Sequence, residues 1–234
     1  MRKYIAVFLF FLSGLAAADP EIGNQFKLTA KNSKQEKSDK IEVVMLFSYT
    51  CKHCYDLDKI LTPWVEKLPK DVVFRRVPVV FRMSMEPTAK AYYVIQKAVD
   101  AEKYNFETLR RPEDLRDYDA AVMLHSRLFN EIHSNKLNPI SESGLIKFIA
   151  NSFSGNSLFE DETFVQNEFK SLETAGRLKG YSKVLESSGA EETPSLVIDG
   201  RFITSSAMAK GHAQALQVAD FLIGKVRAEK RSGK

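Results

Sequence analysis

The sequence has few cysteines: Cys51 and Cys54 are the only two among its 234 residues. With no third cysteine, the chain has no framework of structural disulfides. A bridge that closes so short a loop adds little chain-entropy stabilisation. The sequence also lacks an apolar run of membrane-spanning length after residue 15. Charge is nearly balanced, with 34 Lys and Arg against 30 Asp and Glu. No basic stripe is interleaved with aromatic residues, which argues against nucleic-acid binding.

The first 18 residues have the pattern of a cleaved secretory signal. Basic Arg2 and Lys3 precede an apolar run from Tyr4 to Leu15, and three alanines at 16–18 form a small-residue cleavage site. The apolar run is short for a bilayer span, although an uncleaved membrane anchor is the alternative interpretation. We therefore expect an exported protein whose mature chain begins at Asp19.

Hydrophobic patterning over the next part of the chain predicts a βαβ unit. The segment 41–47 (IEVVMLF) is typical of a strand buried on both faces. Helical spacing follows from Tyr55 to Leu68, where Pro63 could introduce a kink. A second strand is predicted over 72–81, with Pro78 limiting its pairing. The cysteines would then lie where the first strand ends and its helix begins.

The rest of the chain is predicted to be helical and then to return to strands. Apolar residues at three-and-four spacing predict helices over 89–104, 118–133, 141–152 and 164–185. Strands at 193–198 and 201–204 flank the Asp199-Gly200 hairpin signal, and a helix over 208–230 closes the chain. A short edge strand is expected at 26–28 and a surface loop at 31–40.

These patterns predict an α/β domain that is interrupted by a helical insertion. The α/β domain would comprise 19–84 and 187–230, the insertion 85–186, and a flexible basic tail 231–234.

The stretch FSYTCKHCYDLDKIL, residues 47–61, carries both thiols. At CxxC spacing on the first turn of a helix, Cys51 and Cys54 can form a disulfide with little backbone movement. Cys51 would lie near the free N–H groups and the positive end of the helix dipole, where Lys52 and His53 add positive charge or a hydrogen-bond donor. Such settings lower a cysteine pKa from roughly 8.5 to between about 3.5 and 7.5. We predict a reactive Cys51, an oxidising disulfide, and a more buried Cys54 that resolves mixed disulfides.

The alternative interpretation of the cysteine pair is half of a zinc site. A structural zinc ion needs two further Cys or His ligands at suitable spacing. None of the histidines forms a second close pair; they are His53, His125, His133 and His212. We therefore expect no metal and no other cofactor. We assign His53 to the redox site, although it could be an ordinary exposed histidine.

Taken together, these motifs resemble the DsbA family of exported bacterial thiol:disulfide oxidoreductases. The resemblance rests on FSYTCKHCY, on the Thr-Pro pair at 193–194 that opens a strand, on the Asp-Gly hairpin and on the helical insertion. It implies a thioredoxin fold interrupted by a helical insertion domain. It also implies a periplasmic location and re-oxidation by a quinone-linked membrane partner of the DsbB type.

The resemblance assigns roles to four further residues. Pro194 matches a cis-proline that faces the redox cysteines, and the main chain of Thr193 would pair with a substrate strand. A trans proline at the start of a strand is the alternative. Asp58 would share a helix face with the thiols and relay the proton of the buried cysteine. Arg76 matches a lysine that partners this acid; a solvated aspartate and a surface arginine are the alternatives.

Three positions depart from the family pattern. Met45 stands where familiar members carry a buried glutamate, and Lys52 replaces a proline inside the CxxC motif. Thr193, before the proline, is also found in isomerase-type relatives. These differences leave the redox potential open but not the class of chemistry.

The sequence thus favours a monomeric periplasmic oxidase that passes a Cys51–Cys54 disulfide to reduced exported proteins. The insertion and the Pro194 loop would frame an apolar, peptide-accepting surface. A disulfide isomerase or reductase would use the same site, although 19–40 is short for a dimerisation domain. A glutathione-dependent transferase is disfavoured because both cysteines are present. A peptide-binding chaperone or metal carrier would not depend on Cys51.

Overall fold

The computed structural model describes residues 19–31, 39–106, 117–153 and 158–232. Its elements are β1 (Lys27–Leu28), β2 (Ile41–Phe47), α1 (Lys52–Val65), β3 (Val72–Pro78), a 3-10 turn (Met83–Met85), α2 (Glu86–Phe106), α3 (Asp117–His133), α4 (Glu142–Ala150), a second 3-10 turn (Leu158–Glu160), α5 (Glu162–Lys170), α6 (Leu172–Ser188), β4 (Ser195–Ile198), β5 (Phe202–Ser205) and α7 (His212–Arg231). The predicted signal at 1–18 and most of the predicted loop at 31–40 lie outside the described residues. Within the described ranges, no helix has both the length and the hydropathy that a membrane crossing requires.

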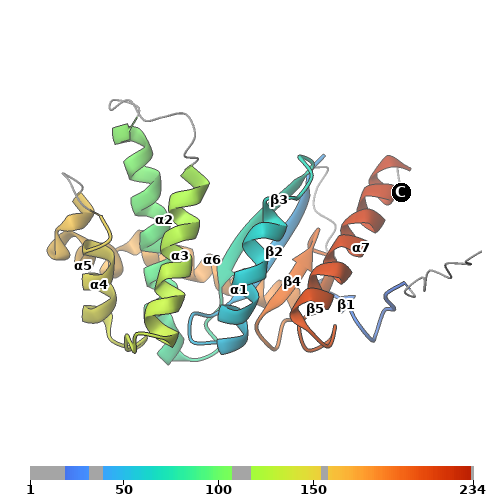
Figure 1. The fold of residues 1–234 in the computed structure, drawn as a ribbon, viewed down its shortest axis with the longest axis horizontal. Helices are drawn as coiled ribbons and strands as arrows, with labels where there is room; N and C mark the ends of the chain where they lie inside the picture. The colour runs from blue at the N-terminus through green and yellow to red at the C-terminus, as the bar shows by residue number, and fades with distance from the viewer. Residues whose placement is uncertain (1–18, 32–38, 107–116, 154–157, 233–234) are drawn as a thin grey trace, which may run out of the picture.

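The strands form one sheet in the order β1-β5-β4-β2-β3 (Figure 1). β2 pairs in parallel with β3, from Ile41 opposite Val72 to Phe47 opposite Pro78, and α1 is the crossover between them. This pairing confirms the predicted βαβ unit. β4 runs antiparallel to both β2 and β5. The hairpin between β4 and β5 turns at Asp199 and Gly200, which have φ angles of 53° and 67°, as a two-residue turn of this kind requires.

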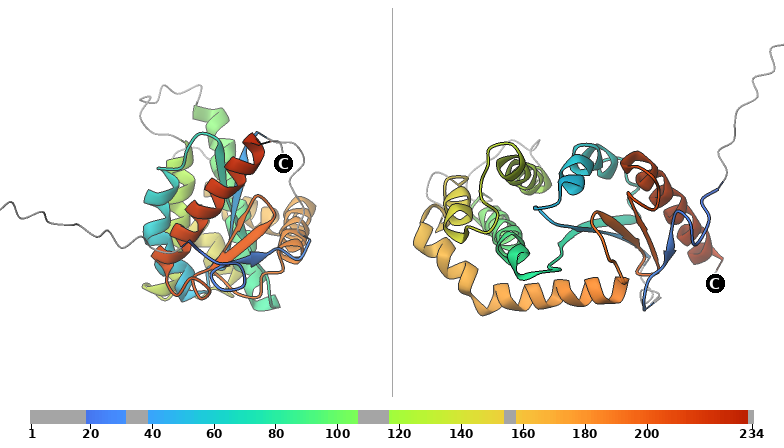
Figure 2. Two further views of the ribbon diagram at one scale, coloured as in Figure 1. Left: turned by 90° about the vertical axis from the view of Figure 1, so that its right-hand side faces the viewer. Right: turned by 90° about the horizontal axis from the view of Figure 1, so that it is seen from below.

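β2 is buried on both faces because its side chains alternate between two apolar clusters. One set packs with α1 and α7; its members are Ile41, Val43, Met45 and Phe47. The other set, Val44 and Leu46, packs with residues of α6. Figure 2 shows α1 and α7 on one side of the sheet and α6 crossing the other. The Cys51 end of α1 is thus mounted on the central strand of the sheet.

Helices α2 to α5 pack together beside the sheet, and α6 runs back from them to cover it (Figures 1 and 2). The prediction of one helix over 164–185 is wrong, because the chain breaks at Ser171 into α5 and α6. Ser171 has an extended backbone (ψ 149°), and its hydroxyl accepts a hydrogen bond from the Thr174 N–H at 3.1 Å. Serine is a preferred N-cap residue, so a helix start here is locally favourable.

Two other predicted boundaries are corrected. β3 ends at Pro78 rather than at residue 81, although the Val79 N–H still donates to the Phe47 carbonyl at 2.8 Å. α7 begins at His212 rather than at residue 208, because the preceding residues form turns and Lys210 has a φ of 61°. The division into 19–84 with 187–230 and an insertion at 85–186 stays a prediction. α6 itself packs both on the insertion helices and on the sheet.

Candidate active site

Cys51 is the N-cap residue of α1, with an extended backbone at φ −90° and ψ 115°. The chain leaves β2 and turns, and the Cys51 N–H donates to the Ser48 carbonyl at 3.1 Å. The Cys51 carbonyl then accepts hydrogen bonds from the N–H groups of Cys54 (3.1 Å) and Tyr55 (3.2 Å). Both thiols are free; that of Cys51 is half-buried and that of Cys54 is fully buried. The predicted arrangement of one accessible and one buried thiol is therefore present.

The pKa of the Cys51 thiol is lowered to about 5. The main cause is a hydrogen bond from the Cys54 thiol, which outweighs the opposing effect of burial; hydrogen bonds from the Thr193 side chain and from the main-chain N–H groups of Cys54 and His53 add to it. Free N–H groups at a helix N-terminus stabilise negative charge in this way. Burial raises the pKa of Cys54 well above its ordinary value. Near neutral pH the reduced site therefore holds one thiolate and one thiol.

The side chains of Lys52 and His53 contact groups other than the Cys51 sulfur. Lys52 Nζ lies 2.6 Å from both carboxylate oxygens of Asp56, so its charge is engaged one turn along the helix. His53 is exposed, and its ring packs near that of His212, with centroids 5.9 Å apart. The leading contributions to the low Cys51 pKa are hydrogen bonds rather than these two side-chain charges. Among them is the main-chain N–H of His53.

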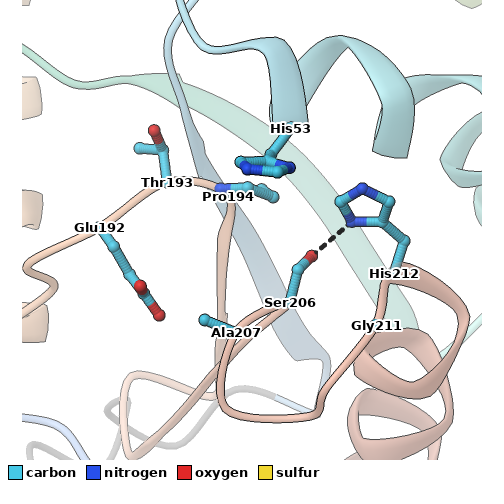
Figure 3. A pocket seen from close by; sticks show the side chains of 8 residues that line it. All are labelled: His53, Glu192, Thr193, Pro194, Ser206, Ala207, Gly211 and His212. Carbon is cyan, nitrogen blue, oxygen red and sulfur yellow. Dashed lines mark hydrogen bonds between the residues drawn. The ribbon is translucent and has the colours of Figure 1, made fainter.

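The Thr193–Pro194 segment lies against the reactive sulfur. The peptide bond between these residues is cis, as the resemblance implied. The Cys51 thiol donates to the Thr193 carbonyl at 3.3 Å. A pocket of about 380 Å³ opens beside this segment (Figure 3). Its walls are His53 of α1; Glu192, Thr193 and Pro194 before β4; and Ser206, Ala207, Gly211 and His212 between β5 and α7.

Asp58 and Arg76 form a buried ion pair, with Arg76 Nη2 3.1 Å from Asp58 Oδ1. The Ser126 hydroxyl donates to Asp58 Oδ2 at 2.6 Å, and His125 Nε2 lies 3.3 Å from Oδ1. Burial opposes ionisation of Asp58, but His125, Arg76 and Ser126 together lower its pKa. A carboxylate held ionised in this way carries no proton at neutral pH. His125, Arg76 and Ser126 thus hold Asp58 as a buried carboxylate, and its expected role in relaying the proton of Cys54 stays a prediction.

Two histidines of α3 hold the turn before Cys51, a role that the sequence did not suggest. The Tyr49 hydroxyl and His125 Nδ1 share a hydrogen bond of 2.8 Å, and His133 Nε2–H donates to the Tyr49 carbonyl at 2.8 Å. Burial, followed by the Arg76 charge, lowers the pKa of His125 to about 4, so His125 is neutral at pH 7. The eight-residue spacing of these histidines on one helix face was the available signal.

Met45 is fully buried on β2, directly opposite Arg76 of β3. At the position where the family resemblance predicts a glutamate, this chain therefore has an apolar core residue. The buried charges below the active-site turn belong instead to Asp58 and Arg76. In the described part of the chain, no group of three or more His, Cys, Asp or Glu side chains is arranged to hold a metal ion.

Comparison with known proteins confirms the resemblance. No protein-family model matches the chain. It is 29% identical to the thiol:disulfide interchange protein DsbA of Pseudomonas syringae pathovar tomato, over 98% of this chain and 95% of that protein. It is 28% identical to the DsbA of Bordetella pertussis, over 79% and 76% of the two chains, and 25% identical to that of Burkholderia cepacia, over 98% and 100%.

Solved structures show the same fold. The crystal structure of Pseudomonas aeruginosa DsbA matches with a TM-score of 0.71 at 24% identity, covering 91% of this chain and 97% of that one. DsbA of Xylella fastidiosa matches with a TM-score of 0.68 at 24% identity, covering 89% and 98%. These matches confirm the predicted thioredoxin fold with a helical insertion. By sequence and by fold, the chain is DsbA-like.

Proposed function

We propose that this chain is a thiol:disulfide oxidoreductase that introduces disulfide bonds into exported proteins through Cys51 and Cys54. The observation that carries the proposal is a pair of opposite pKa shifts. The pKa of Cys51, at the helix N-terminus, is lowered to about 5, whereas the pKa of buried Cys54 is raised. A stabilised thiolate stabilises the reduced pair, so the disulfide form is a strong oxidant. The curated relatives are named for thiol:disulfide interchange.

The reaction moves two electrons from a substrate dithiol to the cysteine pair. A substrate thiolate attacks the Cys51 sulfur of the disulfide, the Cys51–Cys54 bond breaks, and Cys54 takes up a proton because its pKa is high. A second substrate thiolate then attacks the substrate sulfur of the mixed disulfide and displaces Cys51. The low pKa of Cys51 makes it a good leaving group. The substrate leaves with a disulfide and the protein with a dithiol.

Equilibration of the purified protein in glutathione buffers tests the direction of the reaction. We expect a reduction potential of about −120 mV, the value for DsbA, because the Cys51 thiolate is stabilised in the reduced protein. The oxidised fraction can be followed by thiol labelling and mass spectrometry. A reduction potential of about −270 mV, the value for thioredoxin, would contradict the proposed oxidase activity and favour a reductase that uses the same site.

We infer that the substrates are reduced exported proteins in the periplasm and that a quinone-linked membrane protein of the DsbB type restores the disulfide. The secretory pattern at 1–18 and the DsbA-like relatives support this. Exposed Phe81 and Met83 add support for the apolar peptide surface. They follow β3, whose last residue pairs with the last residue of β2, so they leave the sheet at the Cys51 end. We propose that the enzyme acts as a monomer.

A further inference from the structure

The pocket beside the cis-proline, here called the Glu192 pocket, has a single carboxylate in its lining. Glu192 lies on one side, and the rings of His53 and His212 lie on the other, with Pro194 between them (Figure 3). At about 380 Å³ the pocket is at the lower end of the range for ligand sites, a size suited to a single side chain rather than to a large cofactor. The pocket is therefore a candidate subsite for one residue of a substrate.

Glu192 is held by two buried serines on neighbouring strands. Ser195 of β4 donates its hydroxyl to the Glu192 carbonyl at 2.8 Å, and Ser205 of β5 donates its hydroxyl to Glu192 Oε1. Ser195 and Ser205 are direct partners across the β4–β5 pair, and each is 2% exposed. A carboxylate can accept about four hydrogen bonds, so Ser205 leaves capacity for a ligand. Ser205 thus positions one oxygen of this exposed carboxylate before any substrate arrives.

The Glu192 pocket is adjacent to the reacting atoms. Thr193, the next residue in the chain, contacts the Cys51 sulfur through its carbonyl at 3.3 Å. A substrate cysteine bonded to Cys51 therefore brings its neighbouring residues close to Glu192. The charge of Lys52 is directed to Asp56, and Lys210, exposed beside Gly211, does not line the pocket.

We propose that the Glu192 pocket receives the side chain of the residue next to the substrate cysteine and selects Lys or Arg over Asp or Glu. The inference rests on the proposed disulfide exchange at Cys51 and names the substrate class of that site. The attraction acts between the fixed carboxylate and a substrate cation. Repulsion of a substrate anion by the same group widens the difference.

Single-cysteine peptides that differ only in the residue before or after the cysteine (Lys, Gln or Glu) test the proposal. The measured quantity is the second-order rate constant for attack on the oxidised protein at low salt. On one side of the cysteine we expect the Lys peptide to react about three- to fivefold faster than the Gln peptide, as for an exposed ion pair, and the Glu peptide to react slowest. Sodium chloride should reduce the preference through screening.

Two variants show whether Glu192 is responsible. Glu192→Gln keeps an oxygen that can accept from Ser205, and it should bring the Lys-to-Glu rate ratio close to one. Glu191→Gln removes the same charge from an exposed neighbour that does not line the pocket, and it should leave the ratio unchanged. Equal effects of both variants, a preference for Glu peptides, or no preference at either position would overturn the proposal. Reaction of the wild-type disulfide with dithiothreitol separately reports whether exchange at Cys51 occurs.

Discussion

Replacement of Cys51 by serine is expected to abolish disulfide exchange with every substrate. Cys51 is the half-buried sulfur at the helix N-terminus, and the lowered pKa belongs to its thiol. A serine hydroxyl cannot form a disulfide, and the variant therefore lacks the thiolate that acts as the leaving group in the exchange. The measurement is the rate at which the oxidised protein, or its variant, oxidises a dithiol peptide, followed by mass spectrometry. We expect the Cys51→Ser rate to fall to the level of the buffer alone.

The matched variant Cys54→Ser separates the roles of the two thiols. It keeps the nucleophilic Cys51 but removes the thiol that would release Cys51 from a mixed disulfide, so covalent complexes should accumulate on non-reducing gels when the reduced variant attacks a substrate disulfide and expels one substrate thiolate. Exchange activity that survives in Cys51→Ser would contradict the mechanism. Undiminished peptide binding in that variant, together with unaltered protection of substrates, would support a chaperone instead.

Replacement of Asp58 by asparagine is expected to destabilise the protein by about 3–5 kcal/mol, as found when one partner of a buried ion pair is removed. The variant leaves the Arg76 guanidinium buried, with a side-chain exposure of 6%, opposite a neutral group. His125, 3.3 Å from the carboxylate, would also lose its charged neighbour. Urea unfolding at pH 7 measures the free energy of unfolding of both proteins.

Two controls accompany this prediction. The double variant Asp58→Asn with Arg76→Met removes both charges and should recover most of the lost stability. Asp56→Asn breaks the surface ion pairs with Lys52 and Lys59 and should change the stability little. An Asp58→Asn protein as stable as the wild type would contradict the buried pair.

The pH dependence of the Asp58 contribution has a definite sign. The folded state lowers the pKa of Asp58, so its stabilisation is complete above the unfolded carboxyl pKa of about 3.9 and is lost as the pH falls further. The stability advantage of the wild type over Asp58→Asn should therefore be constant from pH 7 down to about 4 and then narrow.

Local patterns were sufficient to predict the parts of the fold that short segments determine. The β2 boundaries at 41–47 match the prediction because every residue of this strand except Glu42 is apolar. The Asp199-Gly200 hairpin follows from backbone preference alone. Two adjoining helices with similar apolar spacing look like one, and only the cap at Ser171 separates α5 from α6.

Contacts between distant segments could not be read from the sequence. His125 and Ser126 reach Asp58 from α3, which belongs to the predicted insertion, and no local pattern links them to the cysteines. The direction of the Lys52 side chain is a related case: its ammonium group lies 2.6 Å from both carboxylate oxygens of Asp56, one turn away. Position next to a thiol did not determine where a flexible side chain points.

The first turn of α1 is expected to hold Cys51 as a thiolate near neutral pH, and the proposed oxidase chemistry depends on this property. Ultraviolet absorbance of the thiolate, titrated in the reduced Cys54→Ala protein and in the reduced wild type, measures this directly. The wild type should ionise at about pH 5, and loss of the Cys54 hydrogen bond should raise that midpoint. A wild-type midpoint close to the roughly 8.5 of free cysteine would contradict the account.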